Sequence, residues 1–237
     1  PMKRLANKVA LVTGAGQGVG QGIALALSDD GAAVAVSGRT LSKVEQTCAM
    51  IRDRGGRALA IECDVKDLAS LKSSVDTVVK ELGGLNILVN NAQEVPLGDL
   101  LSVTDEEINA GWESGPMATL RLMRICYPHL KKSGGNIVNL GTAAALRWDA
   151  GNYGAYAAVK EAIRALSRAA ANEWAKDGIR TNVILPLASS PALAWWMNDR
   201  PEEGAAYVAA VPMRRIGDCE TDIGRFVATL CSDDCAY

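Results

Sequence analysis

Apolar positions follow two alternating patterns along the chain. Short, mainly apolar runs occur at residues 9–12, 33–36, 58–61, 87–89, 136–140 and 181–185. Between them, apolar residues recur every three or four positions, which predicts helices that bury one face, the clearest over about 41–54, 68–82, 104–130 and 156–176. Strands that alternate with helices indicate an α/β protein with a doubly wound parallel sheet and helices on both faces. Ligands should bind beyond the carboxyl ends of its strands.

A glycine-rich turn joins the first strand to the first helix. The run Val9–Val12 leads into Thr13–Gly20, which reads T-G-x-x-x-G-x-G, and Val19, Ile23 and Leu27 then share one helical face. Such a turn lets the backbone approach a phosphate and directs the free N–H groups of the helix toward it. The spacing does not match G-x-G-x-x-G, so a tight turn without a ligand is the alternative. The flanking strand and helix favour a nucleotide site.

Composition and charge narrow the function classes. Hydrophobic residues make up 49% and charged residues 22% of the 237 positions, as in one large globular domain. The formal net charge of −2 gives no indication of a nucleic-acid or anionic-membrane partner. No apolar stretch approaches the roughly 20 residues that a membrane span needs. No signal peptide is evident, and we expect a cytoplasmic protein.

Cysteine and histidine usage gives no indication of a metal centre. The cysteines are scattered, mostly in apolar segments, and are expected to be buried reduced thiols. Cys231 and Cys235 stand four residues apart, but neither a histidine nor a second cysteine pair completes a zinc site. The single histidine, His129, is expected to be partly exposed near a helix end. A mechanism that needs two histidines is excluded.

A second motif follows the fifth strand, where Tyr156 and Lys160 form the pattern Y-x-x-x-K. Together with the glycine turn, it resembles the short-chain dehydrogenase/reductase family, which also places Asn90–Ala92 and Asp64–Val65 where they stand here. The resemblance covers essentially the whole chain. It implies a single Rossmann-type domain over residues 1–237 and an oxidoreductase that transfers a hydride between NADP(H) and a carbonyl or secondary alcohol.

The resemblance implies a cofactor site built from the turns that follow the strands. Asp64 would lie against the adenine, and it could also cap the next helix at its N-terminus. Ser189 or Ser190 would meet the nicotinamide amide. The expected cofactor-binding residues are Gly14, Gln17, Gly18, Val19, Gly20, Arg39, Asp64, Val65, Asn91, Ala92, Tyr156, Lys160 and Ser189.

The end of the second strand bears on the choice of cofactor. NAD-binding folds carry an acidic residue there that bonds the ribose hydroxyls, whereas this chain has Gly38 followed by Arg39. A guanidinium suits a 2′-phosphate, which an acid would repel. NADP(H) is therefore the expected cofactor, with NAD(H) possible. The alternative is an arginine in a solvated loop.

Tyr156, Lys160 and Thr142 are the expected catalytic residues. A free phenol has a pKa of about 10, and a nearby ammonium that lowers it by about two units must supply roughly 3 kcal/mol. Tyr156 would then exchange a proton with the carbonyl oxygen of the substrate. The family's catalytic serine aligns with Thr142, which keeps the hydroxyl. Ala143 stands at the usual distance from the tyrosine, but it cannot donate a hydrogen bond.

Three positions depart from the family pattern. Gly115 stands where the family has the asparagine of its catalytic tetrad, Gln93 replaces a glycine after Asn90–Ala92, and Leu187 replaces a glycine after Pro186. These departures keep a second hypothesis open. The chain could be a catalytically degenerate nucleotide-binding sensor or subunit of the same fold. The intact Tyr156 and Lys160 favour the enzyme, since a pure binder has no need of both.

An irregular segment is predicted from Pro191 to Pro212. In the family the corresponding region, about 187–212 here, is a mobile substrate lid; the alternative is an aromatic hinge packed on the domain or across a subunit contact. Its aromatic residues, with one from an earlier loop, favour an apolar or ring-shaped substrate: Trp148, Trp195, Trp196 and Met197. Thr221–Asp222 is predicted to cap a last helix.

The expected assembly is a homo-oligomer, a homotetramer in the full-length protein. The helix after Tyr156 carries a face of small residues that suits close packing against a second subunit: Ala162, Ala165, Ala169 and Ala170. Small-molecule substrate and cofactor are the other expected partners. The family continues into one more strand after the last helix. Because this chain stops at Tyr237, we expect it to be a truncated or incomplete form.

Overall fold

The computed structural model describes residues 3–147 and 151–237. Its six strands form one parallel sheet in the order β3-β2-β1-β4-β5-β6. The order reverses between β1 and β4, which is the point where ligands bind in such sheets. The predicted strands are thus confirmed: β1 Val9–Val12, β2 Ala33–Gly38, β3 Ala58–Glu62, β4 Ile87–Asn90, β5 Asn136–Leu140 and β6 Arg180–Ile184.

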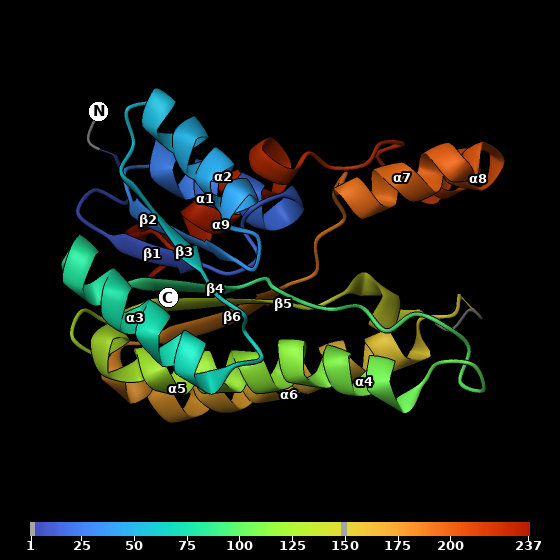
Figure 1. Cartoon of the computed structure of the whole chain (residues 1–237). Helices are drawn as coiled ribbons and strands as arrows, with labels where there is room; N and C mark the ends of the chain where they lie inside the picture. The colour runs from blue at the N-terminus through green and yellow to red at the C-terminus, as the bar shows by residue number, and fades with distance from the viewer. Residues whose placement is uncertain (1–2, 148–150) are drawn as a thin grey trace.

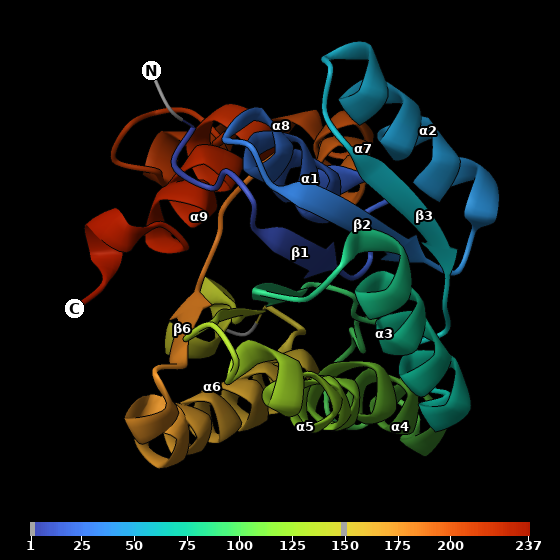
Figure 2. The same cartoon turned by 90° about the vertical axis from the view of Figure 1, so that its left-hand side faces the viewer.

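Helices cover both faces of the sheet (Figures 1 and 2). One face carries α1 Gly18–Asp29, α2 Leu41–Asp53 and α9 Arg225–Leu230, and the other carries α3 Leu68–Leu82, α4 Asp105–Trp112, α5 Ala118–Leu130 and α6 Gly154–Trp174. Successive side chains of a strand point to opposite faces, so each strand contributes to two cores. Ala10 and Val12 of β1 pack with the α1 side, and Val9 and Leu11 with the α3 side.

The start of α3 corrects one expectation about Asp64. The helix is capped by Asp67, whose side chain accepts a hydrogen bond from the backbone N–H of Ala69 at 2.9 Å. Asp64 stands three residues too early to cap it, and instead closes a local turn by accepting from the N–H of Lys66 at 3.0 Å. Leu68, the first residue of α3, is 43% exposed, and the buried face of the helix begins at Leu71.

The predicted long helix over 104–130 is confirmed, with one interruption. α4 and α5 are joined by the π-helical segment Glu113–Met117, which contains Gly115 and Pro116. Proline has no N–H to donate, and a single i→i+5 turn inserted in an α-helix, although rare, accommodates a residue without one. Gly111 does not break α4. A Cβ atom there would lie 2.7 Å from the Pro96 ring, so the glycine allows the loop before α4 to pack on the helix.

The segment predicted to be irregular is helical, which corrects that prediction. α7 Pro191–Asp199 and α8 Pro201–Ala210 each begin with a proline, and the Ser190 side chain caps α7. We call these two the lid helices. They project at the same end of the molecule as the β4–α4 loop, opposite both termini (Figure 1). Trp196 and Tyr207 pack edge to face between them, with ring centroids 5.9 Å apart.

The base of the lid is closed by backbone hydrogen bonds. The N–H of Ser189 donates to the carbonyl of Gly217 at 2.8 Å, and the N–H of Gly217 donates to the carbonyl of Leu187 at 3.2 Å. Ala188 and Gly217 form an isolated parallel bridge. The segment between these points therefore leaves and rejoins the domain at one place.

The last helical region starts earlier than predicted. Asp218, and not Thr221–Asp222, is the cap: its carboxylate accepts from the N–H groups of Glu220 at 3.0 Å and Thr221 at 2.6 Å. The π-helical segment Cys219–Gly224 follows and leads into α9. It lies tightly on α1, since a Cβ atom on Gly22 would be 2.3 Å from the Cys219 carbonyl.

The cysteines are mostly buried, as predicted, and the small-residue face predicted on α6 is exposed only in part. Cys48, Cys63, Cys126 and Cys231 are buried free thiols, and the other two are half-buried. Ala165 and Ala169 are exposed on α6, whereas Ala170, predicted on the same face, is buried in the core. Within residues 3–147 and 151–237, no helix is long and apolar enough to cross a bilayer.

Candidate active site

The predicted site residues gather at the carboxyl edge of the sheet. Because parallel strands end at the same edge, each turn brings its residue there. Gly14 follows β1, Arg39 follows β2, Asp64 follows β3, Asn91 follows β4, Thr142 follows β5 and Ser189 follows β6. The glycine turn lies beside the start of the lid, where a Cβ on Gly18 would be 3.3 Å from the ring of Pro191.

Thr13 and Asn91 hold the glycine turn against the end of β4. The Thr13 hydroxyl accepts hydrogen bonds from the backbone N–H groups of Asn91 and Ala92, both at 3.0 Å. The Asn91 side-chain amide donates to the carbonyls of Thr13 and Gly14, again at 3.0 Å. The side chain of Asn91 thus positions the turn. Thr13 was missed in the sequence, because its role depends on a contact between segments 78 residues apart.

The turn has the shape that a diphosphate needs. Gly14 and Gly18 adopt φ of 61° and 59°, which only glycine enters freely. The Gln17 side chain does not cap α1, since its amide oxygen accepts instead from Lys43 Nζ at 2.8 Å. The first N–H groups of α1 are therefore available to an anion. A Cβ on Gly20 would lie 2.4 Å from the Asn91 amide, which keeps the helix close to β4.

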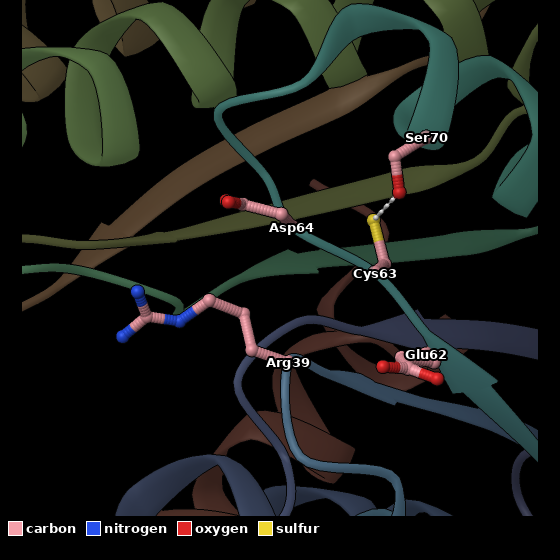
Figure 3. A pocket seen from close by; sticks show the side chains of 5 residues that line it. All are labelled: Arg39, Glu62, Cys63, Asp64 and Ser70. Atoms are coloured by element: carbon pink, nitrogen blue, oxygen red, sulfur yellow. Dashed lines mark hydrogen bonds between the residues drawn. The ribbon is translucent and has the colours of Figure 1, made fainter.

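An open pocket of about 360 Å³ lies where an adenine and its ribose are expected. It is lined by Arg39, Glu62, Cys63, Asp64 and Ser70 (Figure 3). The Ser70 hydroxyl donates to Cys63 Sγ at 3.3 Å, and the side chains of Arg39 and Asp64 extend to the other side.

Glu94 neutralises positive charge beside this pocket. This residue was not identified from the sequence. Its carboxylate pairs with Arg39 at 2.8 Å and with Lys66 Nζ at 2.7 Å. Arg39 is thus neither a free loop arginine nor an unoccupied phosphate ligand. Its side chain is still 60% exposed, so it can exchange Glu94 for another anion.

The remaining residues predicted to bind the cofactor differ in whether their side chains or their backbones are exposed to a ligand. The side chain of Val65 is buried in one core, so only its backbone can face a ligand, whereas that of Val19 is half-buried against the other core. Ser189 is exposed at the lid base, while Ser190 is used as the cap of α7. Leu187 supplies a backbone carbonyl to the lid base.

Lys160 is buried behind Tyr156 on α6. Its ammonium lies 5.8 Å from the centroid of the Tyr156 ring and donates to the carbonyl of Leu140 at 2.8 Å. Only 4% of the residue is exposed. Burial disfavours the charged form and lowers the pKa of Lys160 to about 8.

The pKa of Tyr156 departs from the sequence-based expectation. Burial raises the pKa of the phenol, and a hydrogen bond with the Thr142 hydroxyl opposes the rise only in part. The expected lowering by Lys160 is absent, because the ammonium faces the ring and bonds the Leu140 carbonyl. Thr142 is therefore the hydroxyl that meets Tyr156. Its oxygen also accepts from the N–H of Ala144 at 3.3 Å, and Ala143 is exposed.

Because Lys160 is buried, we predict that the free energy of unfolding depends on pH. The pKa of Lys160 is about 8 in the folded chain and 10.5 when unperturbed, so between these values the unfolded state binds more protons. The free energy of unfolding should then rise with pH, by about 3 kcal/mol across the window. We expect urea unfolding to show this rise in the wild type relative to Lys160→Met. A difference between the two proteins that stays constant from pH 7 to 10.5 would contradict it.

Comparisons with known proteins agree with this geometry. The family described as enoyl-(acyl carrier protein) reductase matches residues 14–237. A 12α-hydroxysteroid dehydrogenase from a Clostridium species is 39% identical over 239 residues, covering 98% of this chain and 92% of the relative.

Two solved structures have the same fold. A 7α-hydroxysteroid dehydrogenase complexed with NADH and 7-oxo glycochenodeoxycholic acid superposes with a TM-score of 0.92 and 30% identity, covering 99% of this chain and 91% of the other. A protein from Beutenbergia cavernae, proposed to be an NAD(P)-dependent gluconate 5-dehydrogenase and carrying bound NADP, gives 0.90 and 30%, covering 100% and 94%.

The match extends over the glycine turn, the Tyr156–Lys160 helix and the lid, and it includes relatives at least 30% identical. The chain belongs to the short-chain dehydrogenase/reductase family and is an NAD(P)-dependent oxidoreductase.

Proposed function

We propose that the enzyme interconverts a ring-borne secondary alcohol and its ketone on a steroid, with NADP(H) as the preferred cofactor and Tyr156 as general acid and base. The observation that carries the proposal is the placement of Tyr156 in front of the buried Lys160, with the Thr142 hydroxyl acting to lower the pKa of the phenol. Two hydroxyls that converge on one point suit a carbonyl oxygen, which accepts two hydrogen bonds.

Each of these residues has a definite task in the reduction. Thr142 donates a hydrogen bond to the carbonyl oxygen and stabilises the charge that develops there. Tyr156 gives its proton to that oxygen and takes it back in the oxidation. Lys160 lies behind the ring and donates to the Leu140 carbonyl, so it supports the tyrosine by position and does not lower the pKa of the phenol in this structure. The nicotinamide supplies or removes the hydride when it is bound at this edge.

The steroid assignment rests on apolar side chains exposed around the entrance. Leu97, Leu100 and Leu101 come from the β4–α4 loop, Leu146 from the loop after β5, and Trp195 from the lid. Their exposed fractions run from 60% to 100%, which is high for large apolar residues. A fused-ring substrate would bury them. Trp148, also expected to line the pocket, lies outside the described residues.

A substrate panel tests this assignment. With NADPH, ketosteroids and oxo bile acids should react with a kcat/KM about 10²-fold above that of cyclohexanone, because each buried Å² of apolar area contributes about 25 cal/mol. Trp195→Ser and Leu101→Ser should lower kcat/KM for the steroids and leave the small ketone unchanged.

Two results would count against the steroid proposal. Equal kcat/KM values for cyclohexanone and steroids would show that the exposed apolar side chains do not bind the fused rings. Tight NADPH binding without turnover of any ketone or alcohol would favour the nucleotide-binding sensor or subunit.

The cofactor preference depends on the competition between a 2′-phosphate and Glu94 for Arg39. Arg39→Ala should weaken NADPH binding about tenfold or more, since a charge-assisted hydrogen bond contributes about 1.5–3 kcal/mol. Glu94→Gln should tighten it, because Arg39 and Lys66 lose their present partner. Dissociation constants from NADPH and NADH fluorescence give the measurement, with NADH as the internal control. A wild-type preference for NADH, or an Arg39→Ala variant with unchanged NADPH affinity, would refute it.

A further inference from the structure

An open pocket of about 440 Å³ lies at the amino edge of the sheet, at the end of the strands opposite the active site. It is bounded by residues that lead into three neighbouring strands, since Lys8 stands directly before β1, Ala32 before β2 and Arg57 before β3. None of the residues predicted to bind cofactor or to act in catalysis lines it. Its volume lies in the range of about 300–1,000 Å³ that is typical of sites for small organic ligands. We call it the amino-edge pocket.

The side chains that line the amino-edge pocket carry three positive charges and no negative charge. The cations are Lys3, Lys8 and Arg57. None of them forms an ion pair with another of the described residues, although the chain as a whole has a net charge of −2. Because the potentials of neighbouring like charges add, three uncompensated cations around one hollow attract an anion.

Nearby acids and helix ends do not account for these cations. Asp29 pairs with Arg54 at 3.1 Å and Asp30 pairs with Arg4, and neither arginine lines the pocket. The carbonyls at the ends of α1 and α2 accept hydrogen bonds from backbone N–H groups of the turns that follow these helices. The lysines are therefore not needed to satisfy the ends of these two helices.

The pocket also offers hydrogen-bond donors that have no partner in residues 3–147 and 151–237. Ser28 is only 4% exposed, and its hydroxyl, which has no partner there, lines the pocket. A Cβ atom on Gly56 would lie 2.1 Å from this hydroxyl, so the glycine leaves it uncovered. The backbone N–H of Arg57 is also unpaired, and its guanidinium donates once, to the Glu81 carbonyl at 2.6 Å. The other N–H groups of this guanidinium remain available to a ligand.

We propose that the amino-edge pocket binds a small phosphate monoester. The phosphoryl group lies among Lys3, Lys8 and Arg57 and accepts a hydrogen bond from the Ser28 hydroxyl, while the organic part fills the rest of the pocket. A phosphoryl group carries about −1.5 to −2 charges at pH 7 and three acceptor oxygens, which suits three cations and a hydroxyl better than a carboxylate does. This site is separate from the cofactor site and goes beyond the proposed function.

The test titrates phenyl phosphate into the protein saturated with NADPH, which fills the glycine turn and the pocket at Arg39, where a phosphate is also expected to bind. Calorimetry should show saturable binding at one site. Inorganic phosphate lacks the organic part and benzoate lacks the second charge, so each should bind about fivefold more weakly or worse. Benzyl alcohol, which has no charge, should not bind.

Substitutions locate the site. Arg57→Met and Lys8→Met should each weaken phenyl phosphate about tenfold or more, because each removes a charge-assisted hydrogen bond. Ser28→Ala removes a neutral hydrogen bond and should weaken it about fivefold. Lys80→Met is the matched control. It removes one positive charge from the last turn of α3, two residues before Leu82 of the pocket, and should leave the affinity unchanged.

Four results would overturn the proposal. Phenyl phosphate that does not bind at millimolar concentration, or that binds Arg57→Met and Ser28→Ala as tightly as the wild type, would exclude this site. An equal loss in Lys80→Met would show attraction to net charge alone. Inorganic phosphate that binds as tightly as phenyl phosphate would indicate an adventitious ion only. If Ser28→Ala does not fold, Arg57→Met at an exposed position makes the same comparison. No turnover is measured, so failure of the wild type on every ketone bears on the proposed function alone.

Discussion

Tyr156→Phe should abolish turnover and leave the affinity for NADPH nearly unchanged. The substitution removes one hydroxyl from a half-buried ring on α6 and keeps the shape of the ring. General acid–base catalysis contributes about 10²–10⁴-fold, so kcat should fall at least that far in both directions of the reaction. The glycine turn, where we expect the phosphates to bind, is braced by Thr13 and Asn91 and has no hydrogen bond to Tyr156 among the described residues. Steady-state kinetics and NADPH fluorescence measure the two quantities.

Tyr153→Phe is the matched control for this experiment. Tyr153 precedes the same helix, but the residue four positions later is Ala157, so no lysine stands behind its ring. We expect it to keep most of the wild-type kcat. Turnover by Tyr156→Phe at the wild-type rate would show that another group moves the proton.

Thr142→Ala should lower kcat by about 10²-fold or more, as the loss of one oxyanion donor does elsewhere. The hydroxyl bonds the Tyr156 phenol and accepts from the N–H of Ala144, so its removal leaves both without this partner. Thr142→Ser keeps the hydroxyl and loses a methyl group on a half-buried residue. It should stay within about tenfold of the wild type, which is the size of effect that one buried methyl can have.

Comparing the serine and alanine variants separates chemistry from packing. If both lose the same activity, the methyl group matters and the hydroxyl does not. If neither loses activity, Thr142 has no part in the reaction. Urea unfolding of both variants, followed in parallel, shows whether a lost rate comes from a lost fold.

The sheet could be predicted because its strands are buried on both faces and read as short apolar runs between helical patterns. The glycine turn was equally readable, since Gly14 and Gly18 stand where positive φ is required. The lid helices were not. Trp195, Trp196 and Tyr207 carry no regular apolar period, and the prolines at 191 and 201 favoured an irregular segment, whereas each begins a helix.

Contacts between distant segments account for the other differences. Asp64 and Asp67 both precede α3, and only the backbone path decides that Asp67 is the cap. The spacing of Tyr156 and Lys160 places them on one helical face, but burial, a tertiary feature, raises the pKa of the phenol and lowers that of the ammonium. Glu94 pairs with Arg39, and the Gln93 amide donates to the Gly111 carbonyl of α4, contacts that no local pattern reveals.

The closed base of the lid has a consequence for how such a chain can diversify. Since Ser189, Leu187 and Gly217 pin both ends of the segment to one point, the strands need not move when the segment between these points changes length. Each doubling of a loop's length adds only about 0.6 kcal/mol of closure entropy. Insertions, deletions and whole exchanges between relatives can therefore accumulate here while the hydride-transfer machinery stays intact. The range of substrates can therefore change by exchange of the lid segment alone, while every intermediate sequence keeps its activity.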